Sequence, residues 1–229
     1  MYRPLPYRCF VGWLVIGSLA FTFLIGAPSP AAIAGNNMRP RIVDDHIPYG
    51  EQRRTQMARY SRRHYGHATW RLRDPRIIVL HFTAGDSYSG ARGWFASNTP
   101  NRGEYPGVCA QFLIGKGGKT GELVRPRTRC RHAIGLNHRA IGIEMVQETG
   151  KGSHWASRQI LQRPKQVRPA LRLVRHLKLR FDIRMRNIIG HAMTNNSPFF
   201  RDLMGWRSDH TDWMWREVRE FRRRLKRML

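Results

Sequence analysis

Residues 76–85 read Arg76-Ile77-Ile78-Val79-Leu80-His81-Phe82-Thr83-Ala84-Gly85, and this stretch decides the fold. Its apolar run is short, rich in β-branched residues, and bounded by Pro75 and the Ala84-Gly85 pair. A short apolar run of this kind is typical of a buried strand in the middle of a sheet. The run therefore predicts a strand that delivers His81 to a rim of the sheet. A single histidine there either satisfies a hydrogen bond in the core or binds a metal, and other residues must decide between the two.

The length of the chain, 229 residues, allows one full domain with a sizeable core and a modest extra segment. Forty-one lysines and arginines against fifteen acids give a formal charge of +26. Such an excess indicates an anionic partner, which could be nucleic acid, acidic lipid or an acidic cell-wall polymer. The sequence has none of the aromatic and basic signatures of nucleic-acid-binding folds, so we do not expect nucleic acid as a partner.

The first residues, 1–34, have the three parts of a secretory signal. Two arginines precede an apolar segment at 10–25, and a small-residue site at 32–34 predicts cleavage before Gly35. The apolar segment has about sixteen residues and a bilayer span needs roughly twenty, so we favour a cleaved signal over a retained membrane anchor. Cleavage would lower the formal charge only from +26 to +24. We therefore expect an exported protein in the periplasm, cell wall or extracellular space, which touches a membrane only through an uncleaved leader.

Cys109 and Cys130 would be the only cysteines of the mature chain. In an oxidising compartment they could form one disulfide, and two unpaired buried thiols are the alternative. Spacing along the sequence does not separate these two states.

A basic N-terminal extension covers residues 35–70, and a domain covers 71–229. The extension is rich in Arg, His, Tyr and Pro, and we expect it to contain a short helix at 51–65 and either to pack on the domain or to lead up to it. In the domain, strands are predicted at 76–85, 109–114, 140–146 and 187–191, with a glycine turn at 115–119 that joins a hairpin. Helices are predicted at 87–97, 167–181 and 215–228. The sequence therefore predicts a single α/β domain with a central, mostly buried, mixed β-sheet flanked by helices.

Three of the predicted strands carry a polar residue within or at the end of their apolar run. His81, Glu144 and His191 each lie within or at the end of an apolar run that is followed by small, polar or loop-forming residues. We expect these strand ends to meet on one rim of the sheet. A polar loop at 207–213 precedes the last helix and adds two aspartates. Two histidines and one carboxylate, with a further glutamate that need not bind, are the composition of a catalytic zinc site.

Five motifs follow one another along the domain: Leu80-His81-Phe82-Thr83, Arg131-His132-Ala133, Asn137 through Ile141-Gly142-Ile143-Glu144, Ile189-Gly190-His191, and His210-Thr211-Asp212. Their order resembles the type-2 N-acetylmuramoyl-L-alanine amidase family, which is related to peptidoglycan recognition proteins and phage amidases. The resemblance covers about two thirds of the chain, from residue 76 to the last helix. It implies an amidase/peptidoglycan-recognition-like fold.

The resemblance also implies roles for single residues. His81, His191 and Asp212 match the ligands of a Zn²⁺ ion. Glu144 matches the glutamate that positions or deprotonates the attacking water. His132 lies where the family often has a substrate-facing histidine, and we expect it, with Thr83 and Asn137, to contact the substrate. Thr83 faces the same side of its strand as His81, because side chains alternate with a period of two.

The implied activity is hydrolysis of the amide between the lactyl group of muramic acid and L-alanine in peptidoglycan. A non-catalytic module of the same fold that only binds peptidoglycan or muropeptides is the alternative. Anionic cell-wall polymers carry phosphates and carboxylates, so a strongly basic surface would concentrate the enzyme on them, and less so as salt rises.

The last loop departs from the family pattern. The family usually has a lysine two residues before the third ligand and Pro-Gly after it, whereas His210 precedes Asp212 here and a Trp-Met pair follows. An alternative register puts Arg207 at the lysine position and makes Asp209 the ligand. We favour Asp212, because the Asp-Trp pair leads directly into the final helix. A cation beside the metal would stabilise the oxyanion during hydrolysis, and a protonated His210 or Arg207 could supply it.

Overall fold

Six strands form one mixed β-sheet in the order β1-β4-β3-β5-β2-β6. The computed structural model describes residues 39–229, so the predicted leader at 1–34 lies outside the described residues. The strands are β1 (Val43–Asp44), β2 (Ile77–Ala84), β3 (Phe112–Ile114), β4 (Thr120–Glu122), β5 (Ala140–Glu148) and β6 (Ile188–Gly190). β2 pairs in parallel with β5 and β6, and β5 pairs in parallel with β3. β3 and β4 form the predicted antiparallel hairpin, and β1 pairs in parallel with β4. The mixed sheet expected from the sequence is confirmed.

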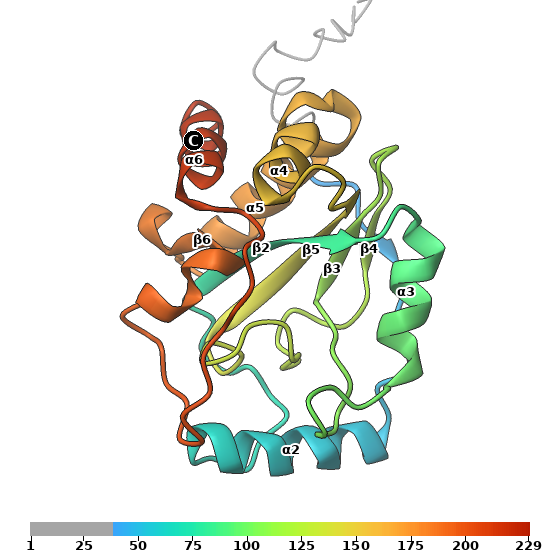
Figure 1. The fold of residues 1–229 in the computed structure, drawn as a ribbon, viewed down its shortest axis with the longest axis vertical. Helices are drawn as coiled ribbons and strands as arrows, with labels where there is room; N and C mark the ends of the chain where they lie inside the picture. Colours follow the sequence, from blue (N-terminus) through green and yellow to red (C-terminus); the bar gives the residue numbers. More distant parts are fainter. Residues whose placement is uncertain (1–38) are drawn as a thin grey trace, which may run out of the picture. The chain divides into compact units, whose positions relative to one another are not determined.

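The α-helices of the described residues are α2 (Glu51–Tyr65), α3 (Tyr88–Ser97), α4 (Ser153–Gln162), α5 (Pro164–Arg180) and α6 (Trp215–Lys226). Figure 1 shows α4, α5 and α6 together on one side of the sheet and α2 beneath the other side. The sequence predicts all of them except α4, which has few buried apolar residues: Ala156, Ile160 and Leu161. Among residues 39–229, no helix combines the length and the apolar content needed to cross a bilayer.

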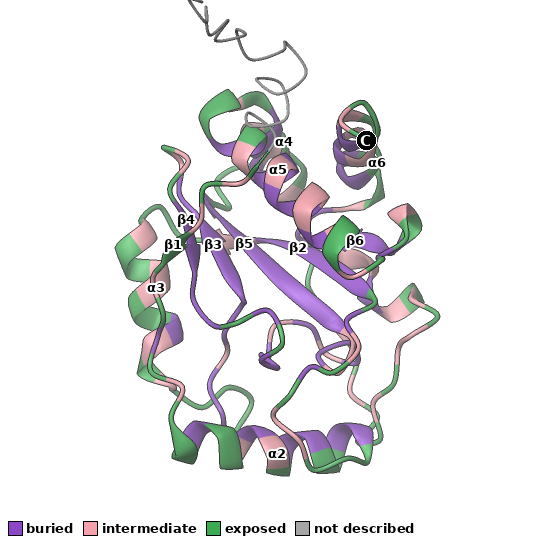
Figure 2. Cartoon of the chain, turned by 180° about the vertical axis from the view of Figure 1, so that it is seen from behind, coloured by how far each residue is buried: buried purple, intermediate pink, exposed green. Residues whose placement is uncertain are grey.

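The two faces of β2 have different neighbours, because successive side chains of a strand point to opposite sides. Ile78 and Leu80 belong to the largest hydrophobic cluster, which also contains the apolar stripes of α5 and α6. Ile77 and Val79 belong to a separate cluster on the other face. His81 continues the alternation of Ile77 and Val79, so it points away from the layer of α5 and α6. Figure 2 shows that the central strands between the two layers are buried.

The N-terminal extension packs on the domain. Residues 39–70 lie in one compact unit with the rest of the described chain. The predicted helix at 51–65 is confirmed as α2, and its buried residues include Met57, Tyr60 and Tyr65. Arg53 of α2 is only 3% exposed, and its guanidinium donates to the carbonyl oxygens of Phe95 and Val108 at 2.8 and 3.1 Å. The extension therefore holds the chain that follows α3.

Cys109 and Cys130 form a disulfide, with their Cα atoms 5.2 Å apart. Both residues are fully buried, in a cluster that also contains Phe95 and Leu113. Of the two states that the sequence leaves open, the structure therefore has the disulfide and not two free thiols. A bond that closes a loop of this length stabilises a fold by about 3 kcal/mol, because it restricts the unfolded chain.

Candidate metal centre

Three side chains converge near the carboxyl ends of β2 and β6. Nδ1 of His81 lies 3.0 Å from Nδ1 of His191 and 3.3 Å from Oδ2 of Asp212. Nδ1 of His191 lies 3.1 Å from Oδ1 of Asp212. All three residues are buried, and their donor atoms lie close enough together to hold one metal ion. The structure therefore brings together the two histidines and the aspartate that the sequence favours as ligands.

Strand register places these groups. Leu80 pairs with Gly190 across β2 and β6, so the next residues, His81 and His191, lie side by side. The last loop then crosses β6, where the carbonyl oxygen of Asp212 accepts a hydrogen bond from the Ala192 amide at 3.0 Å. A Cβ atom at position 190 would collide with the backbone that follows Asp212. Glycine at position 190 is thus what lets the loop bring its carboxylate to the histidines.

The spacing of the three donors suits zinc. Zinc binds imidazole nitrogen and carboxylate oxygen at about 2.0–2.1 Å, in a tetrahedron whose edges are then about 3.3 Å. The three observed separations of 3.0, 3.1 and 3.3 Å are close to that edge. Three protein ligands on one tetrahedron leave a fourth position open, as in catalytic zinc sites.

The charge states of these residues also suit a cation. Burial, followed by repulsion from His81, lowers the pKa of His191 to about 4, so its imidazole is neutral at pH 7. Burial alone would raise the pKa of Asp212, but its contacts with His191, His210 and His81 hold it well below its ordinary value. A neutral imidazole and an ionised carboxylate are the forms that bind metals.

Glu144 lies beside the three donor residues and makes no hydrogen bond to them. It is paired with His81 across β2 and β5, on the same face of the sheet. Among the described residues, its buried Oε2 atom has no hydrogen-bond partner. Burial raises the pKa of Glu144 to about 7, against the opposing effect of His81. A buried carboxyl group with a free oxygen and a pKa near neutrality is suited to accept and return a proton.

His132 lies behind His81. Nδ1 of His132 is 3.0 Å from Nε2 of His81, and Nε2 of His132 is 3.4 Å from the carbonyl oxygen of Ala140. Because a carbonyl oxygen can only accept, Nε2 of His132 carries the proton and Nδ1 accepts a hydrogen bond from His81. Burial lowers the pKa of His132 well below its ordinary value, which keeps its ring neutral. A Cβ atom at position 142 would collide with this ring, so Gly142 of β5 makes room for it.

The last loop contains both aspartates considered from the sequence, and the structure separates them. Asp209 has a 74% exposed side chain and accepts a hydrogen bond from Arg102 at 2.9 Å. It therefore lies outside the group formed by His81, His191 and Asp212. Of the two candidate cations, Arg207 lies over the ring of Phe200, whereas His210 stacks on His191 with ring centroids 4.0 Å apart.

A cleft of about 970 Å³ opens over the metal centre. Thr83 lines it, and its hydroxyl donates to the Gly85 carbonyl and accepts from the Gln147 amide. Asn137 also lines it, but the Asn137 side-chain oxygen accepts from the backbone amides of His132 and Ala133. Asn137 thus shapes the loop that carries His132. Substrate contact by Thr83, His132 and Asn137 stays a prediction.

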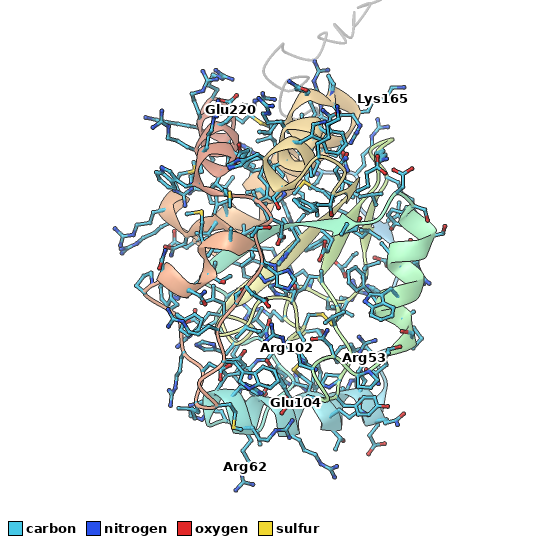
Figure 3. All side chains as sticks on the ribbon, in the orientation of Figure 1. Arg53, Arg62, Arg102, Glu104, Lys165 and Glu220 are labelled. Atoms are coloured by element: carbon cyan, nitrogen blue, oxygen red, sulfur yellow. A yellow bond between two sulfur atoms is a disulfide. The ribbon has the colours of Figure 1, made fainter. Side chains whose placement is uncertain are left out.

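The sequence does not reveal one wall of the cleft. Asn101 and Arg102 line this wall, and two buried arginines hold the segment around them through backbone carbonyl oxygens. Arg53 reaches it from α2, and Arg131 donates to the carbonyls of Glu104 and Pro106 at 2.6 and 2.7 Å. Figure 3 shows Arg53, Arg102 and Glu104 between α2 and the sheet. Arg131 belongs to a motif quoted for its histidine and Arg53 to no motif, and the sequence points to neither arginine for this role, because backbone carbonyl acceptors leave no pattern in the side-chain sequence.

A family model described as N-acetylmuramoyl-L-alanine amidase matches residues 71–212. Among solved structures, the Staphylococcus aureus hydrolase AmiA in complex with its ligand is 13% identical with a TM-score of 0.54, over 90% of this chain and 93% of that chain. The N-acetylmuramoyl-L-alanine amidase LysC from Clostridium intestinale is 18% identical with a TM-score of 0.46, over 79% of this chain and 96% of that chain. No curated protein sequence matches.

The likeness to AmiA extends over nearly the whole of both chains and shows the fold. The family match covers more than half of the chain and includes His81, Glu144, His191 and Asp212. This chain therefore belongs to the N-acetylmuramoyl-L-alanine amidase family.

Proposed function

We propose that this chain is an exported, zinc-dependent N-acetylmuramoyl-L-alanine amidase that hydrolyses the amide between the lactyl group of muramic acid and L-alanine in peptidoglycan. The observation that carries the proposal is the convergence of His81, His191 and Asp212 beside Glu144, whose buried oxygen is unpartnered among the described residues. A chain that had kept the fold only for recognition would have no need of a buried proton acceptor at that place.

The residues have distinct roles in the reaction. His81, His191 and Asp212 would hold Zn²⁺, which supplies Lewis acidity that polarises a carbonyl oxygen and acidifies water. Glu144 accepts a proton from the water that attacks the amide carbon. As the C–N bond breaks, Glu144 passes this proton to the nitrogen of L-alanine. The products are a lactyl carboxylate and a stem peptide with a free amino group.

His210 is placed to stabilise the negative charge that develops on the amide oxygen. It stacks on His191 at the mouth of the cleft, and its Nδ1 lies 3.6 Å from Oδ1 of Asp212. The contact with the Asp212 carboxylate raises the pKa of His210, which favours the imidazolium form. A fixed cation beside a developing oxyanion lowers the barrier to hydrolysis.

Two observations support export. Residues 1–34 have the pattern of a secretory signal, and Cys109 and Cys130 form a disulfide, which persists in oxidising compartments. Expression of the full chain followed by mass measurement of the product tests this part. We expect the mature chain to begin at Gly35, and an intact Met1 on the isolated protein would contradict cleavage.

Mass spectrometry of purified muropeptides tests the activity, with zinc measured in each protein. The wild-type chain should release free stem peptide, Glu144→Ala should keep zinc without cleavage, and Asp212→Ala should lose both. Asp209→Ala is the matched control, since it removes an exposed carboxylate from the same loop. Bound zinc and bound muropeptide without cleavage by the wild type would instead favour a recognition module.

A further inference from the structure

A second hollow, of about 480 Å³, lies between α4 and α6, and we call it the arginine groove. It is lined by Arg158 and Leu161 of α4 and by six residues of α6: Trp215, Arg216, Glu217, Arg219, Glu220 and Arg223. On α6, the arginines at 216, 219 and 223 recur at spacings of three and four, so they lie along one face of the helix. The groove is therefore a concentrated patch of guanidinium groups.

The positive charge of the arginine groove is not neutralised from within. Glu220 is already paired with Arg223 and Arg224, and Glu217 accepts a hydrogen bond from His154 at 3.0 Å. Within residues 39–229, the side chains of Arg158, Arg216 and Arg219 make neither an ion pair nor a hydrogen bond. Four arginines and two glutamates in the lining leave a net positive charge, so an anionic ligand would be attracted there.

The arginine groove also contains an exposed aromatic ring. Trp215 is 54% exposed, in contrast to Trp213 two residues earlier, which is fully buried. An exposed tryptophan beside arginines offers an apolar ring face next to charged hydrogen-bond donors. Such a pair suits a ligand in which apolar faces, such as those of sugar rings, alternate with carboxylates.

Two segments of the chain, α4 and the end of the last loop, run from the cleft to the arginine groove. Ser153, the first residue of α4, and Thr211 both line the cleft, and their hydroxyl groups lie 2.6 Å apart. Arg158 follows Ser153 by five residues of helix, which is about 7.5 Å along the axis. Trp215 follows Thr211 by four residues. The arginine groove is therefore only a few residues of chain from the Ser153–Thr211 border of the cleft, which is within reach of a long polymer bound in the cleft.

A membrane surface fits the arginine groove less well than a polymer does. The apolar face of α6, formed by Val218, Phe221 and Leu225, is fully buried in the core. Trp215 is the one large apolar residue of α6 that is exposed, so this helix has no apolar stripe to insert among lipid chains. A hollow with separate charged groups matches a chain-like ligand with repeated acidic groups.

We propose that the arginine groove is a second binding site for the polymeric substrate, where Arg158, Arg216 and Arg219 bind stem-peptide carboxylates of peptidoglycan beyond the segment held in the cleft. This proposal rests on the proposed function, since it takes its ligand from the same polymer. It assigns part of the large positive charge of the chain to one place on the surface.

Binding to insoluble peptidoglycan, measured by cosedimentation, tests the proposal. The test uses the Glu144→Gln background, so that cleavage does not alter the polymer and the result does not depend on activity. The groove variant is Arg158→Gln, Arg216→Gln and Arg219→Gln together. The matched control is Arg59→Gln, Arg62→Gln and Arg73→Gln, which removes the same charge from exposed arginines elsewhere. Figure 3 shows Arg62 at the opposite end of the molecule from Glu220 of α6.

We expect the groove variant to bind the polymer about tenfold more weakly at low salt and the control to change by less than about twofold. The difference should shrink as salt rises. Trp215→Ala should weaken binding without changing its salt dependence. In the active background, the groove variant should lose rate on polymer relative to its rate on a single disaccharide-peptide. If the wild type does not cleave that fragment, the proposed function is wrong. The cosedimentation result still shows whether the arginine groove binds the polymer.

Equal losses in the two triple variants would show that only total charge matters and would overturn the proposal. Unchanged polymer binding by the groove variant would overturn it as well. Vesicles containing an anionic lipid and a random DNA duplex serve as alternative ligands. A tenfold loss on either of them, with no loss on peptidoglycan, would assign the arginine groove to another partner. Circular dichroism melting of all variants excludes a general loss of folding as the cause.

Discussion

Nε2 of His81 lies 3.0 Å from Nδ1 of His132, so the ring that offers its other nitrogen to the metal centre is oriented from behind by a second histidine. His132 is in turn tied to the carbonyl of Ala140, and its backbone amide donates to Asn137. This arrangement fixes which nitrogen of His81 is free to bind a cation. Groups that hold a metal ligand in this way contribute to metal affinity as well as to activity.

Replacement of His132 by Phe should therefore weaken zinc binding by about 10- to 100-fold, since His81 loses the acceptor that orients it. Competition with a chelator of known affinity measures the change. His138→Phe is the control, because His138 lies near His132 in the sequence and makes no contact with His81. Equal zinc affinity in His132→Phe and the wild type would show that His132 does not position His81.

The third ligand can be tested by removing each aspartate of the last loop. Asp212→Ala should lose stoichiometric zinc, because Asp212 is buried between His81 and His191. Asp209→Ala should keep it, because its carboxylate is exposed and paired with Arg102. Zinc content by atomic absorption after gel filtration gives the answer. Retention in Asp212→Ala together with loss in Asp209→Ala would support the other register of the loop.

Glu144 should make the metal-free protein less stable as pH rises. Burial raises its folded pKa to about 7, above the ordinary value of 4.5, so between these values the folded state binds more protons than the unfolded state. The unfolding free energy therefore falls between about pH 4.5 and 7, by about 3 kcal/mol in total from this group. Urea denaturation of metal-free wild type and Glu144→Gln at several pH values measures it. Parallel pH dependences in the two proteins would contradict a raised pKa.

His210 should contribute the alkaline side of the pH–rate profile. Its contact with the Asp212 carboxylate raises its pKa above 6.5, and the proposed role needs the protonated ring, so activity should fall as pH rises through the raised pKa. In His210→Gln, kcat should be lower and this alkaline decline should disappear. Steady-state rates on a soluble muropeptide at pH 5 to 9 provide the measurement. A profile with the same alkaline limb in the variant would remove His210 from this role.

Loss of the disulfide should destabilise the fold without changing the metal centre. Cys109→Ser with Cys130→Ser removes a covalent link across a sequence separation of 21 residues, for which we expect a loss of about 3 kcal/mol. Thermal unfolding of the double variant and the wild type, both loaded with zinc, measures the change. Equal melting temperatures, or a large fall in zinc content at room temperature, would contradict this separation of roles.

The sequence predicts most of the sheet and the residues near the metal centre, and the reason is geometric. β2, β5 and β6 are parallel, and their register sets Glu144 opposite His81 and His191 next to it, so the three polar side chains meet at one place. The sequence favours Asp212 over Asp209 but leaves the second register of the last loop open, since the position of each carboxylate depends on how that loop crosses Gly190. The strand predicted at 109–114 is shorter in the structure, Phe112–Ile114, because Cys109 is tied to Cys130 and to the Arg131 carbonyl.

The position of Arg53 matters for the design of truncated or chimeric forms of this protein. The family match begins at residue 71, after Arg53 and Tyr60, yet Arg53 holds the chain that borders the cleft and Tyr60 lines it. A fragment trimmed to the matched region would keep every group that performs chemistry and lose part of the frame around it. The residues of the metal centre and the residues that shape the entrance of the cleft thus come from different segments of the chain. Exchanging residues 39–70 between relatives is therefore a way to alter substrate preference while leaving the zinc ligands in place.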